Sequence, residues 1–217
     1  RNAPKIMERL YNNRIYRQHL NQRGGTQTIM LGFSDGTKDG GYVTANWEIY
    51  RAKERLTAVS RQNGVTVIFF EGRGGPPARG GGNTHKFYRS LGSRIESRQI
   101  HLTVQGQTIS SNFGTEVNAR YNLEQLVTAG IENHLFPEEA GVPNEEDGRK
   151  LDRLSELSRN HYLLLKDDAA FLPYLEEMTP LTYYGETNIA SRPTSRGSTE
   201  ELRFEDLRAI PFVGAWS

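Results

Sequence analysis

The feature that most constrains this chain is an apolar run, residues 65–70, that leads into a glycine-rich segment, residues 72–82. The run predicts a buried strand, and the segment after it contains six glycines. Glycines let the backbone approach a ligand closely, and the guanidinium groups of Arg73 and Arg79 suit phosphate or carboxylate. The segment therefore predicts an anion site at the carboxyl end of a strand, formed by these two arginines and by Gly72, Gly74, Gly75, Gly80 and Gly81.

Other interpretations of this segment fit less well. A dinucleotide fingerprint would need glycine where Pro77 stands, and a P-loop would need Gly-Lys-Ser/Thr where Arg79-Gly80-Gly81 stands. An RGG-like nucleic-acid-binding module would repeat and alternate with aromatic residues, whereas this segment occurs once, after a strand. A flexible surface loop remains the simplest alternative.

Composition excludes several function classes. The net charge is +1, from 27 basic and 26 acidic residues, which argues against a nucleic-acid partner. The chain has no cysteine, so disulfides and thiolate metal sites are excluded and a reducing cytoplasm is expected. No apolar run approaches the ~20 residues needed to span a bilayer, so no membrane partner is expected.

The first third of the chain reads as alternating strands and helices. We expect helices over 2–10 and 16–20, a strand over 26–33, a polar loop over 34–41, a helix over 42–62, the strand 65–70 and a short helix over 84–90. Parallel strands joined by a helical crossover place the loops that follow them at one edge of the sheet. Asp35 and Lys38 should therefore lie near Arg73 and Arg79.

The remainder is expected to be mostly helical. Residues 100–104 and 108–113 read as a hairpin, long helices are expected over 116–135 and 145–165, and a shorter one is expected over 169–178. We expect residues 1–114 to supply barrel-type strands with the glycine-rich loop (71–84), and residues 115–217 to form a helical region with an arginine-rich loop. Both would belong to one larger catalytic domain, because the chain begins without methionine and ends on an apolar run, as a piece of a longer protein would.

The polar segment 34–41 is a second candidate site. Asp35 could bind a hard cation such as Mg²⁺, and Lys38 could supply a point charge for an anion. A calcium loop fails because Asn46 stands where its bidentate glutamate belongs. A surface turn ahead of a capped helix remains an equal alternative.

Further cations occur late in the chain, at Arg192, Arg196 and Arg208. Arg208 is flanked by apolar residues, so burial would require an anionic partner, and a salt bridge to Glu205 or Asp206 is the simpler interpretation. The five histidines show no metal-ligand spacing, and only His85, just after the glycine-rich loop, is a secondary candidate.

Taken together, these segments resemble phosphoenolpyruvate carboxylase. The resemblance depends on four stretches, which are residues 30–35 with Lys38-Asp39-Gly40-Gly41, 70–82 with Thr84-His85, Ser191-Arg192-Pro193, and 207–211 with Ala215-Trp216. It implies an α/β fold, part of a TIM-like β/α barrel with many long helices. It also implies a cytoplasmic homotetramer that uses Mg²⁺ or Mn²⁺ to convert phosphoenolpyruvate and bicarbonate into oxaloacetate and phosphate.

The resemblance also implies roles for individual residues. Asp35 would bind the metal and Lys38 would be an active-site cation. Arg73 and Arg79 would contact phosphate, bicarbonate or carboxyphosphate from a mobile loop. Arg192 and Arg208 would complete the anion pocket.

The chain departs from the family pattern at three places. Glu71 stands where a histidine is usual, Pro76-Pro77-Ala78 stiffens the loop, and Ser195 replaces a lysine. Glu71 beside an anion site would need to pair with an arginine, and it is the one hint of a catalytically silent relative. The family's second metal carboxylate and its catalytic histidine fall outside these residues, so we expect the 217-residue chain by itself to be inactive.

Overall fold

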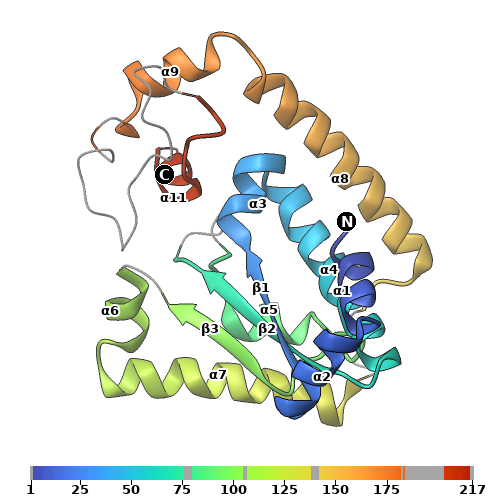
Figure 1. Ribbon diagram of the computed structural model, residues 1–217. Coiled ribbons are helices and arrows are strands. Elements are labelled where there is room, and N and C mark those ends of the chain that lie inside the picture. Colours follow the sequence, from blue (N-terminus) through green and yellow to red (C-terminus); the bar gives the residue numbers. More distant parts are fainter. Residues whose placement is uncertain are drawn as a thin grey trace.

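The computed structural model describes residues 2–75, 80–104, 107–137, 142–181, 183 and 203–215. Its centre is a parallel sheet of three strands in the order β1 (Thr26–Gly32), β2 (Thr66–Arg73) and β3 (Ile100–Val104) (Figure 1). In the register, Gly32 lies opposite Gly72, so β1 and β2 end nearly level. The mixed α/β class with parallel strands is thus confirmed, although the described residues do not form a complete barrel.

One face of the sheet is covered by helices. The crossover helix α4 (Tyr42–Gln62) matches the predicted bounds, and α5 (Thr84–Arg89) follows β2. α7 (Glu116–Leu135), also predicted to the residue, packs against α5. The sheet and these helices share a core of seven buried residues, which are Leu56, Val67, Phe69, Tyr88, Leu91, Ile95 and Ala129. This core fixes the sheet against α4 and α5, which matters for the site because it holds the end of β2 rigidly.

Two short helices lie at the amino ends of the strands, α1 (Ala3–Tyr11) and α2 (Arg14–Gln22). Pro4 stands in the first turn of α1, and the Asn13 side chain caps α2 by accepting from the amides of Ile15 and Tyr16. The buried Tyr11 hydroxyl lies 2.9 Å from Ser60 Oγ of α4. These contacts close the end of the sheet away from the candidate site.

The C-terminal part is helical, as expected. It contains α8 (Glu145–Lys166), α9 (Phe171–Met178) and α11 (Ala209–Gly214). The Asn144 side chain caps α8, and three acidic residues in its first turn stabilise the helix by interacting with the positive end of its dipole. A second core unites this region through Phe171, Leu175, Leu181, Leu207, Phe212 and Val213. Because α11 also contacts α3 (Phe33–Gly40), the 203–215 segment lies on the carboxyl side of the sheet (Figure 1).

Two sequence-based predictions are wrong. Residues 34–41 are not a loop, because Phe33–Gly40 form helix α3, which packs on α4 and α11. Gly41, at φ +81°, separates α3 from α4. Because α3 packs on two other helices, tertiary contacts outweigh the poor helix propensity of its residues.

The predicted hairpin is also wrong. β3 pairs in parallel with β2, and its supposed partner is helix α6 (Gln107–Phe113). The Asn118 and Asn122 side chains of α7 donate to the carbonyls of Ser111 and Asn112, which ties α6 to α7. A short segment with few apolar residues carries no periodicity that could have distinguished these structures.

Within the described ranges, no helix is both long enough and apolar enough to cross a membrane.

Candidate functional site

The carboxyl ends of β1 and β2 form a surface without side chains. Gly32 and Gly72 lie opposite each other in register and therefore face the same side of the sheet. A Cβ atom on Gly32 would lie 2.9 Å from Asp35 Oδ2, whereas one on Gly72 would meet no atom within 4 Å. The exposed Asp35 carboxylate thus lies over an open cradle that two side chains would otherwise fill.

Arg73 connects the end of β2 to the far end of the glycine-rich segment. Its side chain is 7% exposed and lies on the helix-covered face, opposite to Gly72. Its Nε donates to the Gly80 carbonyl at 2.5 Å, and Cζ lies 4.0 Å from the centre of the Phe87 ring. The segment therefore leaves the sheet at Arg73 and returns to the same side chain.

Phe33 links the glycine-rich segment to helix α3, which contains Asp35. It is the first residue of α3 and is buried, and it contacts Phe87 edge-on with ring centres 5.9 Å apart. Its ring also lies against Gly80, where a Cβ atom would come within 2.7 Å of Phe33 Cγ. Gly80 has φ +82°, so both backbone and space require glycine. The start of α3 therefore contacts the returning end of the glycine-rich segment at the carboxyl edge of the sheet, with Asp35 over the Gly32–Gly72 face and Arg73 on the helix-covered face; the closeness of Asp35 and Lys38 to Arg73 and Arg79 stays a prediction.

A pocket of about 550 Å³ opens at the ends of β2 and β3. Arg73, Gly74, Gly75 and Gly81 line it, together with six polar residues, Thr84, Thr103, Thr108, Ser111, Asn112 and Asn122. Gly81 touches the Gly75 carbonyl so closely that no side chain would fit there. The pocket thus combines a cation, hydrogen-bonding groups and closely approaching backbone.

Lys38 of α3 and Arg208, which precedes α11, lie where these two helices meet beside the C-terminal core. Lys38 is 8% exposed, and its Nζ lies 4.8 Å from the centre of the Phe204 ring and 3.7 Å from Asp39 Oδ1. The Arg208 Nε atom is buried without a hydrogen-bond partner. In the part of the chain that the structure describes, Arg208 forms no ion pair with Glu205 or Asp206, so the simpler interpretation from the sequence is not observed.

Two predicted site residues cannot be placed. Arg79 and Arg192 lie outside the described residues, as do Arg196 and Ser195.

His85 is placed as a structural residue. Its Nε2 lies 3.2 Å from Glu132 Oε1, and Arg89 Nε lies 3.1 Å from the other oxygen of that carboxylate. Both contacts join α5 to α7. Across the described ranges, no three histidine or acidic side chains gather as a metal cluster, so Asp35 would share a cation mainly with water and with groups from elsewhere.

Sequence reasoning missed the partners of Glu71. This carboxylate is fully buried; Lys53 of α4 forms an ion pair with Oε1, and the Tyr88 hydroxyl of α5 donates to Oε2 at 2.7 Å. Burial lowers the pKa of Lys53 against the opposing effect of Glu71, and burial raises the pKa of Tyr88. Glu71 therefore pairs with a lysine and a tyrosine, not with the expected arginine. Lys53 lies on the apolar stripe of its helix, three residues from both Tyr50 and Leu56. This position was the signal in the sequence that the lysine is buried and needs an acidic partner.

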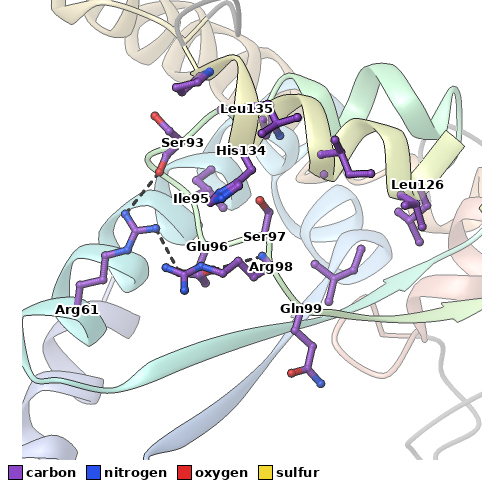
Figure 2. Close-up of a pocket in the computed structure, with 17 residues that line it drawn as sticks. Arg61, Ser93, Ile95, Glu96, Ser97, Arg98, Gln99, Leu126, His134 and Leu135 are labelled. Carbon is purple, nitrogen blue, oxygen red and sulfur yellow. Dashed lines mark hydrogen bonds and ion pairs between the residues drawn. The ribbon is translucent and has the colours of Figure 1, made fainter. Parts of the chain in front are cut away.

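A larger pocket, about 840 Å³, lies at the amino end of β3 (Figure 2). Arg61 and Arg98 converge there on Glu96, at 3.2 Å and 3.4 Å, and α7 supplies an apolar wall. Since Glu96 already engages both arginines, this pocket suits a doubly charged anion less well than the pocket lined by Arg73 does.

The described residues form an α/β fold with a parallel sheet, the class in which ligands commonly bind at the carboxyl ends of the strands. Residues 1–217, the whole chain, match the family model described as Phosphoenolpyruvate carboxylase. The chain therefore belongs to the phosphoenolpyruvate carboxylase family.

Curated relatives agree with this membership. Those named phosphoenolpyruvate carboxylase include proteins from Corynebacterium efficiens (41% identical over 98% of this chain), Roseiflexus castenholzii (38% over 98%) and Mycobacterium leprae (38% over 100%). The chain spans 23%, 22% and 23% of these relatives' lengths. It thus corresponds to under a quarter of a full-length enzyme.

Proposed function

We propose that this chain supplies part of the active site of a phosphoenolpyruvate carboxylase, which joins phosphoenolpyruvate and bicarbonate into oxaloacetate and phosphate. The observation that carries the proposal is the Asp35 carboxylate over the Gly32–Gly72 cradle, beside a glycine-rich segment held by Arg73. These groups could hold a cation and a polyanion at the same edge of the sheet, which this reaction requires.

Asp35 is the proposed ligand for Mg²⁺ or Mn²⁺. The carboxylate is exposed, and the two glycines beneath it leave room for a hydrated ion. Mg²⁺ commonly uses one or two carboxylates and retains several waters, which fits a site with a single described acidic ligand. When bound, the metal would neutralise negative charge that develops on the enolate oxygen.

The arginines and Lys38 are the proposed anion-binding groups. Arg73 and Arg79 would orient the phosphoryl group as a bicarbonate oxygen attacks phosphorus and the bond to the enolate oxygen breaks. The enolate carbon then takes the carbon dioxide released from carboxyphosphate. Lys38, Arg192 and Arg208 would complete the pocket, and the unpartnered Nε atom of Arg208 supports a role in anion binding. Glycines 72, 74, 75, 80 and 81 would let the loop close and exclude water.

The sheet is proposed to be part of a TIM-like β/α barrel in a cytoplasmic homotetramer. Parallel strands are normally covered on both faces, yet Met30 on the helix-free face is 68% exposed. Other parts of a longer polypeptide would cover this face and close the barrel. The absence of cysteine supports a reducing compartment.

The test is carboxylation by the full-length polypeptide that contains this segment. We expect bicarbonate-dependent oxaloacetate formation, and we expect Asp35→Asn to weaken Mn²⁺ binding while the fold is kept. The isolated 217-residue chain should form no oxaloacetate. A full-length enzyme that folds and binds Mn²⁺ but never forms oxaloacetate would instead be a catalytically silent relative. Nucleic-acid binding by the glycine-rich segment would show as retention of RNA that falls steeply with salt.

A further inference from the structure

A buried network lies directly beneath the candidate anion site. Glu71 and Arg73 are two residues apart on β2, so both side chains project from the helix-covered face. Both are almost fully buried. A buried carboxylate this close to a guanidinium would normally pair with it.

The structure shows a different pairing. Both Glu71 oxygens are engaged elsewhere, Oε1 by Lys53 and Oε2 by the Tyr88 hydroxyl. Arg73 turns instead to the Gly80 carbonyl, with its Cζ atom 4.0 Å from the Phe87 ring centre and 5.3 Å from that of Tyr88. Arg73 thereby keeps its positive charge free of a carboxylate partner within the described residues.

The rings of α5 keep the two cations apart. Lys53 Nζ lies 5.2 Å from the centre of the Phe87 ring that also carries Arg73. Tyr88 is held in turn by its backbone, since Asn133 of α7 donates to the Tyr88 carbonyl at 2.7 Å. The Tyr88 hydroxyl donates to Glu71 and also interacts with the Arg73 side chain, so it lies between the carboxylate and the guanidinium.

We propose that Lys53 and Tyr88 are positioning residues that occupy the Glu71 carboxylate and so prevent it from capturing Arg73. This inference rests on the proposed function, because it assumes that Arg73 serves a phosphate-like or carboxylate ligand. It also explains how a carboxylate is compatible with an anion site at this position. Without the Tyr88 hydroxyl, Glu71 Oε2 loses its donor, and the Arg73 guanidinium, two residues along β2 on the same face, can take its place.

The test uses four forms of the full-length enzyme: wild type, Tyr88→Phe, Tyr88→Phe with Glu71→Gln, and Tyr11→Phe. Tyr88→Phe removes one hydroxyl and keeps the ring. Tyr11→Phe is the matched control, since it also removes a buried tyrosine hydroxyl that contacts α4 but lies at the opposite end of the sheet. kcat/KM for phosphoenolpyruvate is measured on folded protein, with thermal midpoints recorded for each variant.

We expect Tyr88→Phe to lower kcat/KM on the order of tenfold, because a misdirected guanidinium stabilises the developing charge poorly. The added Glu71→Gln should restore most of that loss, since a neutral amide does not hold Arg73. Tyr11→Phe should lower the thermal midpoint to a similar degree with kcat/KM unchanged. This recovery distinguishes positioning from simple stabilisation.

Two results would overturn the inference. If Tyr88→Phe and Tyr11→Phe have the same kcat/KM, Tyr88 does not act on Arg73. If Glu71→Gln gives no recovery in the Tyr88→Phe background, Glu71 is not the competitor. An inactive wild-type enzyme would instead overturn the proposed function, and this inference with it.

Discussion

Gly32→Ala tests whether the space above the end of β1 belongs to the Asp35 carboxylate. Gly32 has φ −104° and ψ +104°, an extended conformation that alanine adopts without strain. The new Cβ would lie 2.9 Å from Asp35 Oδ2, and ordinary contact begins at 3.4 Å, so the carboxylate must move by at least 0.5 Å. Metal–ligand distances in protein sites lie within about 0.2 Å of their standard values, so a carboxylate displaced by 0.5 Å no longer meets an ion held in its original position.

We therefore expect Gly32→Ala to weaken Mn²⁺ binding by roughly 10- to 100-fold. Stability should change by less than about 1 kcal/mol, because only the end of an exposed side chain is displaced. The assay is Mn²⁺ titration of the full-length enzyme by electron paramagnetic resonance. Gly130→Ala in α7 is the control, since its Cβ meets no atom within 4 Å and the residue lies by the pocket at the amino end of β3, so Mn²⁺ affinity should be unchanged. Equal Mn²⁺ affinity in Gly32→Ala and wild type would refute the reasoning.

Three further predictions concern the loop and the buried network. Arg79→Ala in the full-length enzyme should lower kcat by roughly 100-fold or more with the circular dichroism spectrum unchanged, and near-normal turnover would remove Arg79 from the site. Gly80→Ala should cost about 2–5 kcal/mol of local stability, from a left-handed backbone and a clash with buried Phe33, seen as faster proteolysis of the loop. Burial raises the pKa of Tyr88 above its usual value of 10. Above pH 10 the folded state therefore keeps a phenol proton that the unfolded chain releases, and the free energy of unfolding falls as pH rises. Tyr88→Phe should make this alkaline loss shallower by up to about 1.4 kcal/mol per pH unit, and identical pH dependence of thermal midpoints would contradict a buried, protonated Tyr88.

The sequence was sufficient wherever one periodic signal was long. The apolar stripe of α4 and the amphipathic pattern of α7 predicted both helices to the residue, and the apolar runs predicted β1 and β2 within a few residues. The parallel arrangement of these strands then followed from the helix between them. The placement of the segments after β1 and β2 at one edge of the sheet needed no more information than this.

Local composition was misleading where packing decides the structure. Residues 33–40 are rich in glycine and polar side chains, yet contacts with α4 and α11 make them helical. The Lys53–Glu71–Tyr88 network joins three elements, so no local window contains it. Only the placement of Lys53 on an apolar stripe hinted that this charge is buried.

The central claim is that two groups at one edge of the sheet bind ligands together. Asp35 of α3 would hold a metal ion, and Arg73 with the glycine-rich segment would hold an anion. Its most direct test is a crystal structure of the full-length enzyme with Mn²⁺ and a phosphoenolpyruvate analogue, using the anomalous signal of manganese. We predict a manganese peak about 2.2 Å from an Asp35 oxygen, with the phosphate group of the analogue on the Arg73 side of the cradle. A manganese peak away from Asp35, or an analogue bound at the amino ends of the strands, would contradict the account.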